Sequence, residues 1–126
     1  MNIYYYSRSG HSAALAKALA FNHEVEAREI IDTQSYDGPI GFLMGGRAAL
    51  SEFEDPILYT KPDSEPILLV FPVWAGRFPP AVRSFIKEVG REKLILVPTS
   101  AGSKLIDREG FRKIIDVVQK DFNKNV

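Results

Sequence analysis

The sequence predicts a single α/β domain over residues 1–126, built on an open parallel sheet with helices on both faces. Two observations predict this class. Two runs, 67–71 and 94–97, are apolar at every position, which is typical of strands buried on both faces of a parallel sheet. Segments with helical periodicity alternate with such runs, so the chain should pass between parallel strands by right-handed crossovers.

In the first half of the chain, residues 1–6 form a β-rich run and residues 11–21 are strong helix formers. Residues 25–31 mix β-branched and charged side chains and predict a shorter, half-exposed second strand. Residues 42–53 predict a weak helix because Gly45 and Gly46 interrupt it. Residues 55–66 contain three prolines and predict a long connection with turns.

In the second half, the strand at 67–71 should end at Pro72. A helix then opens at Pro79 and Pro80, where proline is well tolerated. Its core-facing stripe is formed by Val82, Phe85, Ile86 and Val89, and Gly90 should close it. The strand at 94–97 should end at Pro98.

The C-terminal part predicts one more helix, from Asp107 to about residue 122. Its apolar stripe would consist of Phe111, Ile114, Ile115, Val118 and Phe122. With no fifth strand, the sheet would have four strands in the order 2-1-3-4, and the strand at 94–97 would lie at an exposed edge. Such an apolar edge lacks the charges that usually protect it, so we expect a homodimer. The alternative is that the segment from Ser103 to Ile106 folds back and shields the edge within one chain.

The amino-acid composition limits the kinds of binding partner and compartment that we expect. Lys+Arg and Asp+Glu both number 16, which favours neither nucleic acid nor an anionic membrane surface as a partner. The chain has no cysteine, so disulfides and thiolate metal sites are excluded and a reducing compartment fits. No signal peptide or membrane-length apolar run is present, and we expect a cytoplasmic protein.

Ligands of open parallel sheets bind beyond the carboxyl ends of the strands, so three loops should converge on one site. The first loop runs Ser7-Arg8-Ser9-Gly10-His11-Ser12 and leads directly into a helix. Its hydroxyl groups, the glycine and the positive end of the helix dipole suit an anion, most naturally a phosphate. The alternative is an ordinary helix cap, because serine is a preferred N-cap residue.

The other two loops are Pro72-Val73-Trp74-Ala75-Gly76, which continues to Phe78, and Thr99-Ser100-Ala101-Gly102-Ser103. All three segments resemble those of the flavodoxin family. The first is similar to its FMN phosphate loop, Ser/Thr-x-Ser/Thr-Gly-Asn-Thr, with His11 in the place of Asn and Ser12 in the place of Thr. The second is similar to Pro-Ile-Trp-x-Gly, and the third to Thr-Ser-Gly-Gly-Ser, with Ala101 in the place of a glycine.

This resemblance implies a flavodoxin-like fold with noncovalently bound FMN, and it makes the sixteen residues of the three loops candidates for cofactor binding. Trp74 would stack on the isoalloxazine ring, whereas the alternative is a tryptophan that anchors the loop in the core. Gly76 and Gly102 would let the backbone approach the polar edge of the ring. The resemblance ends at about Ser103.

The function that follows is an FMN-binding flavoprotein acting in electron transfer, with a redox protein or a small-molecule electron acceptor as its partner. No catalytic acid, base or nucleophile is needed. Two alternatives stay open. One is an FMN-dependent NAD(P)H:quinone-type reductase, and the other is a flavin-free binding module with the same fold.

Overall fold

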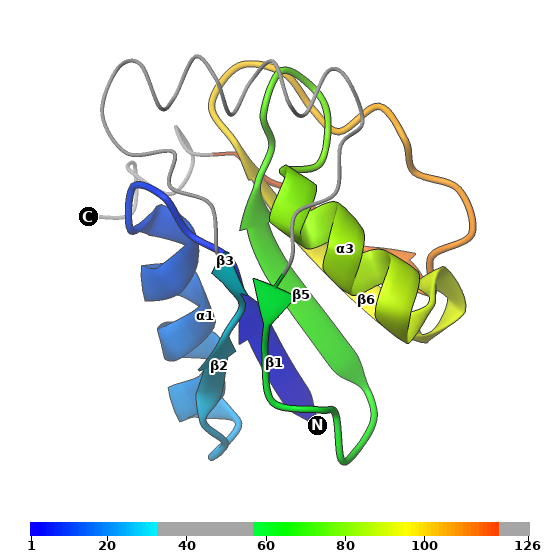
Figure 1. Ribbon diagram of the computed structural model, residues 1–126. Helices are drawn as coiled ribbons and strands as arrows, with labels where there is room; N and C mark the ends of the chain where they lie inside the picture. The colour runs from blue at the N-terminus through cyan, green and yellow to red at the C-terminus, as the bar shows by residue number, and fades with distance from the viewer. Residues whose placement is uncertain (33–56, 119–126) are drawn as a thin grey trace.

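The computed structural model describes residues 1–32 and 57–118. Its main sheet is entirely parallel, in the order β2-β1-β5-β6-β7, with β8 also paired to β6 (Figure 1). The strands are β2 (Ala27–Glu29), β1 (Asn2–Tyr5), β5 (Ile67–Pro72), β6 (Leu94–Ser100), β7 (Lys113–Ile114) and β8 (Val117–Val118). The α/β class is confirmed, and so is the 2-1-3-4 order of the four strands that the sequence predicts.

The helices α1 (His11–Asn22) and α3 (Pro80–Val89) cover opposite faces of this sheet. Alternate residues of each strand enter the two cores. Ile3 and Tyr5 of β1 pack with Ala16 of α1, whereas Tyr4 packs with Phe85 of α3, with ring centroids 4.8 Å apart. The sheet is therefore buried on both sides, as its continuous apolar runs predict.

The central pair β5 and β6 runs in register from Ile67 opposite Leu94 to Pro72 opposite Thr99. The prediction that β6 ends at Pro98 is wrong, since the strand continues to Ser100. On its other side, β6 pairs with β7 at Ile95 and Leu96 and with β8 at Thr99 and Ser100. Neither short strand pairs with Pro98, which has no N–H to donate to a ladder.

The prediction of a helix from Asp107 onward and a missing fifth strand is wrong, because Lys113–Ile114 and Val117–Val118 form β7 and β8 beside β6. Gly110 has φ 83°, which breaks a helix at this point. The N–H of Arg112 donates to the Leu94 carbonyl at 3.0 Å, and that of Ile115 donates to the Leu96 carbonyl at 2.8 Å. Backbone hydrogen bonding to the open edge of β6 thus determines the structure of this segment, despite its helical periodicity. Because β7 and β8 pair with this edge, the reason for expecting a homodimer no longer applies.

The predicted second strand divides into β2 and β3 (Ile31–Asp32), and β3 pairs antiparallel with β4 (Ile57–Leu58). The predicted weak helix at 42–53 lies outside the described residues. A short 3₁₀ helix, η1 (Arg91–Lys93), joins α3 to β6. Within the described ranges, no helix is long and apolar enough to cross a membrane.

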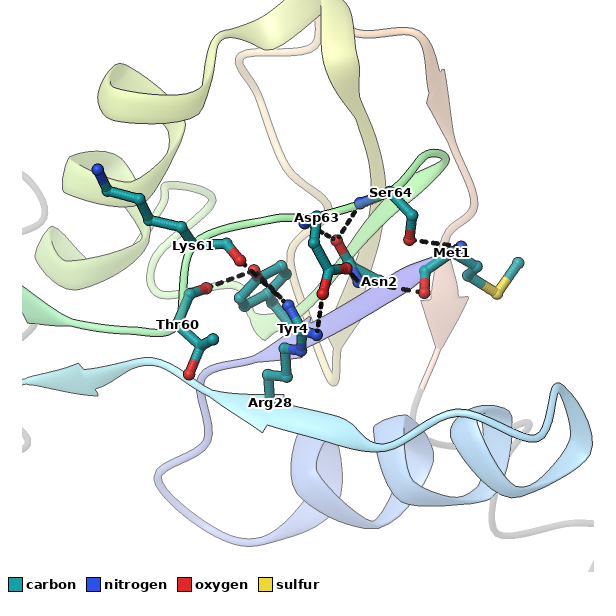
Figure 2. Close-up of polar contacts among 8 residues, drawn as sticks. All are labelled: Met1, Asn2, Tyr4, Arg28, Thr60, Lys61, Asp63 and Ser64. Carbon is teal, nitrogen blue, oxygen red and sulfur yellow. Dashed lines mark hydrogen bonds and ion pairs between the residues drawn. The ribbon is translucent and has the colours of Figure 1, made fainter.

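A polar cluster fixes the loop before β5 to the start of β1 (Figure 2). The Asn2 side chain donates to Asp63 Oδ1 at 2.8 Å and accepts from the backbone N–H groups of Asp63 and Ser64. Arg28 pairs with Asp63 at 3.1 Å and donates to the Tyr4 hydroxyl at 3.3 Å. The hydrogen bond from Asn2 and that from Arg28 lower the pKa of Asp63. This cluster stabilises the amino ends of the central strands and leaves their carboxyl ends for a site.

Candidate functional site

The first loop ends in a glycine that starts α1. Gly10 is the N-cap residue, with φ 96°, and its N–H donates to Ser7 Oγ at 3.0 Å. No side chain caps the helix through its N-cap residue, and no acidic residue lies in its first turn. Ser9 Oγ and His11 Nδ1 lie 3.0 Å apart beside this helix start. The N-terminus of α1 therefore keeps its positive character for an anion.

Ser12 takes a different position from the other loop hydroxyls. It is buried, and its Oγ lies 3.0 Å from Thr99 Oγ1, which in turn donates to the Phe71 carbonyl at 3.2 Å. Because the Thr99 proton is used on Phe71, the Ser12 hydroxyl donates to Thr99. Ser12 thus joins the first loop to β5 and β6 through Thr99.

The second loop is a tight turn. Trp74 and Arg77 exchange two backbone hydrogen bonds of 2.9 Å each, and the two residues between them both have positive φ. The angles are 52° for Ala75 and 76° for Gly76, which matches the type I′ arrangement that closes a two-residue hairpin. The N–H of Val73 donates to the Thr99 carbonyl at 2.9 Å, so the second loop is also fixed to β6.

The Trp74 side chain is only 7 % exposed and belongs to the core cluster on the α3 face. Its ring packs edge-on against Tyr6, with centroids 5.9 Å apart and planes at 66°. It also lines the cleft described next. The interpretation that Trp74 anchors its loop in the core is therefore confirmed, and the same side chain also forms part of the wall of the cleft. Its stacking on an isoalloxazine ring stays a prediction.

The three loops meet around a cleft of about 230 Å³ at the carboxyl ends of β1, β5 and β6. Eight of the sixteen candidate residues line it: Arg8, Ser9, His11, Pro72, Val73, Trp74, Thr99 and Ala101. Two further lining residues, Leu15 and Val117, were missed from the sequence. Leu15 lies one turn after His11 on the same side of α1, a spacing that could have indicated it. Val117 falls within the segment that the sequence predicts as a helix, so the sequence pattern does not place it near the cleft.

The other eight candidates are outside this lining: Ser7, Gly10, Ser12, Ala75, Gly76, Ser100, Gly102 and Ser103. Ser7, Gly10 and Ser12 shape the first loop through the contacts given above. Ala75 and Gly76 form the turn of the second. Ser100 is the buried last residue of β6, whereas Gly102 and Ser103 are exposed, and Gly102 has open space around it.

One side of the cleft is polar and the other is apolar. One side carries the start of α1 with Arg8, Ser9 and His11, and the other is apolar, with Trp74 and Val117 among its residues. This donor set fits a ligand that combines a phosphate with a flat apolar body, and FMN is such a molecule. Within the ranges 1–32 and 57–118, no group of three or more His, Cys, Asp or Glu residues could hold a metal ion.

Sheet order, helix placement and a cleft at the carboxyl ends of the central strands define a flavodoxin-like α/β domain. Searches with family models and of curated proteins found no match. Solved structures do match. A flavoprotein of Lactobacillus acidophilus NCFM, crystallised in complex with FMN, is 18 % identical, with a TM-score of 0.67 over 97 % of this chain and 95 % of its own.

Two proteins from Bacteroides, each described as a predicted flavoprotein, match almost equally well. That of Bacteroides uniformis is 19 % identical, with a TM-score of 0.66 over 98 % of this chain and 94 % of its own. That of Bacteroides eggerthii is 15 % identical, also at 0.66, over 97 % and 92 %. At these identities the likeness shows the fold, and the flavodoxin-like fold inferred from the sequence is confirmed.

Proposed function

We propose that this chain binds FMN in the cleft and acts in electron transfer. The observation that carries the proposal is the uncapped start of α1 beside an apolar wall that contains Trp74. The phosphate would be held by the first loop, through Arg8, Ser9 and the backbone N–H groups of the helix start. The ring would be held by the second and third loops. A protein of the same fold crystallised with FMN supports the choice of ligand.

FMN, when bound, supplies the redox chemistry through its isoalloxazine ring. The residues of the chain bind and orient the cofactor and exclude water from one side of it. Two hydrogen bonds hold the three loops at fixed spacing: one joins the Val73 N–H to the Thr99 carbonyl, and the other joins the Ser12 and Thr99 hydroxyls. Such preorganisation limits the entropy that binding would otherwise cost. We further propose that the protein is cytoplasmic and exchanges electrons with a redox protein or a small-molecule acceptor.

A titration of the apoprotein with FMN and with riboflavin tests this function. We expect FMN fluorescence to be quenched at micromolar protein and riboflavin to bind at least tenfold more weakly. Riboflavin lacks the phosphate, and each charge-assisted hydrogen bond to that group is worth about 1.5–3 kcal/mol. Equal affinities would refute the phosphate loop, and the absence of any FMN binding would refute the proposed function.

Turnover separates electron transfer from the reductase alternative. The FMN-loaded protein should oxidise NADH only slowly when a quinone is the acceptor, because we propose that it exchanges electrons with a partner. Flavin photoreduction followed by reoxidation with an artificial acceptor serves as the positive control for a competent flavin. Rapid quinone-dependent NADH oxidation by the pure protein would instead identify a reductase.

A further inference from the structure

Thr99 is the first residue of the third loop, and it is hydrogen-bonded to the other two. Its carbonyl accepts the N–H of Val73 from the second loop at 2.9 Å. Its Oγ1 lies 3.0 Å from Ser12 Oγ of the first loop and donates to the Phe71 carbonyl of β5 at 3.2 Å. Hydrogen bonds of Thr99 therefore connect the three loops that surround the cleft.

The backbone of Thr99 is held in the sheet on both sides. It lies opposite Pro72 of β5 and opposite Val117 of β8. Positions on strands are fixed more precisely than positions on loops, because the ladder limits their movement. The sheet thus sets the position of Thr99, and the first and second loops take their distance from it.

The hydrogen bonds also decide what the Ser12 side chain can do. A serine or threonine hydroxyl has one proton to donate. Thr99 donates its proton to Phe71, so Ser12 donates to Thr99. Ser12 is only 2 % exposed and is outside the described lining of the cleft, whereas Thr99 belongs to that lining. Phosphate oxygens are held by donors, and the Ser12 hydroxyl has no proton left for an anion at the start of α1.

We infer that Ser12 and Thr99 are positioning residues, which set the distance between the phosphate loop and the two loops that hold the ring. The inference rests on the proposed binding of FMN in the cleft. The resemblance to flavodoxins makes Ser12 a candidate for cofactor binding. The bond to Thr99 instead gives its side chain a role within the protein, one step removed from the ligand.

A fixed distance between the loops matters only for a ligand that occupies both halves of the site at once. When phosphate and ring belong to one molecule, binding of one half brings the other to its loops at a high effective concentration, provided that the spacing is right. Riboflavin or inorganic phosphate fills one half alone and needs no such match. Loss of the bond between Ser12 and Thr99 should therefore weaken the binding of FMN more than that of either fragment.

Fluorescence titrations with FMN and riboflavin, and isothermal titration with inorganic phosphate, test this in Ser12→Ala, Thr99→Val and the double variant. We expect each single substitution to weaken FMN about fivefold, as is typical for the loss of one neutral hydrogen bond, and to weaken each fragment less than twofold. The double variant should bind FMN no more weakly than Thr99→Val, because both changes break the same bond. Thr99→Ser keeps the hydroxyl and should bind FMN like the parent.

Two other serines provide matched controls. Ser84 is also buried, and its hydroxyl donates to the Pro80 carbonyl at 3.2 Å within α3, so Ser84→Ala should leave FMN affinity unchanged. Ser9 lines the cleft, so Ser9→Ala should weaken FMN and inorganic phosphate by the same factor. Ser12→Ala keeps the test decisive if Thr99→Val does not fold, because it leaves the bond from Thr99 to Phe71 in place.

The outcomes separate this inference from the function on which it rests. If Ser12→Ala weakens inorganic phosphate as much as FMN, Ser12 is a phosphate ligand and the inference is refuted. An equal loss for riboflavin, additive losses in the double variant, or unchanged FMN affinity in both single variants would refute it as well. In each of these cases the parent still binds FMN. A parent that does not bind FMN would refute the proposed function itself, together with this inference.

Discussion

Replacing Trp74 by alanine tests whether one side chain both anchors its loop and lines the cleft. Trp74 is 7 % exposed and packs edge-on against Tyr6 at 5.9 Å. Truncating a buried tryptophan to alanine typically costs about 3–5 kcal/mol, of which an aromatic pair accounts for about 0.5–1.5 kcal/mol. For a domain of this size, about 4 °C of melting temperature is lost per kcal/mol. We therefore expect the apoprotein to melt about 12–20 °C lower.

The same substitution should weaken FMN binding by about 1–3 kcal/mol, by analogy with stacking of aromatic side chains on nucleic-acid bases. Thermal melts of the apoprotein monitored by circular dichroism and fluorescence titrations with FMN measure the two effects separately. Trp74→Phe is the control, since it keeps an aromatic ring and should show a smaller change in both. It also keeps the test informative if the alanine variant does not fold.

The loss of stability and the loss of FMN affinity can be separated. An apoprotein that melts within about 3 °C of the parent would show that the packing on Tyr6 contributes little, contrary to its burial. Loss of stability with unchanged FMN affinity would show that the flavin ring does not contact Trp74. In that case the apolar wall of the site would have to be sought elsewhere in the cleft.

Two further predictions concern the backbone and pH. Gly10→Ala should lower the melting temperature by about 4–8 °C, because φ 96° costs an L-residue about 1–2 kcal/mol while no atom within 4 Å obstructs the new Cβ. Gly102→Ala, also in open space but without a positive φ, should melt like the parent and is its control. The second prediction is that the melting temperature falls as pH drops below about 4. The pKa of Asp63 is lower in the folded protein, so its contribution is present above the unfolded pKa and is lost as pH falls through the folded pKa. Asp63→Asn should reduce that pH dependence and lower stability at pH 7, and an unchanged acid profile in this variant would contradict the assignment to Asp63.

The central part of the fold follows from the sequence because its signals are local and agree with one another. The strand β5 is apolar throughout, and α3 combines prolines at its start, a stripe at helical spacing and Gly90 at its end. Both elements were predicted within one or two residues. The order of the strands then follows from general rules for parallel sheets and from the resemblance to flavodoxins.

The contacts that shape the site were harder to predict. Ser12 bonds to Thr99, a residue 87 positions away, so nothing in the local pattern distinguishes its hydroxyl from those of Ser7 and Ser9. A serine at a helix start predicts a cap or an anion ligand equally well. Whether a hydroxyl caps the helix, binds an anion or bonds to another strand depends on the residue that lies opposite it once β1 and β6 are in place.

The largest error, at the C-terminal end, has a physical cause that also explains why Val117 was missed as a residue of the cleft. The strands β7 and β8 have two residues each, too few for any periodicity, and their apolar residues satisfy a helical stripe by chance. What determines their structure is the unpaired side of β6, where backbone groups require partners. Once the segment pairs there, it brings Val117 into the cleft at the carboxyl ends of the strands. The segment beyond Ser103, where the resemblance to flavodoxins ends, thus supplies a residue to the cleft.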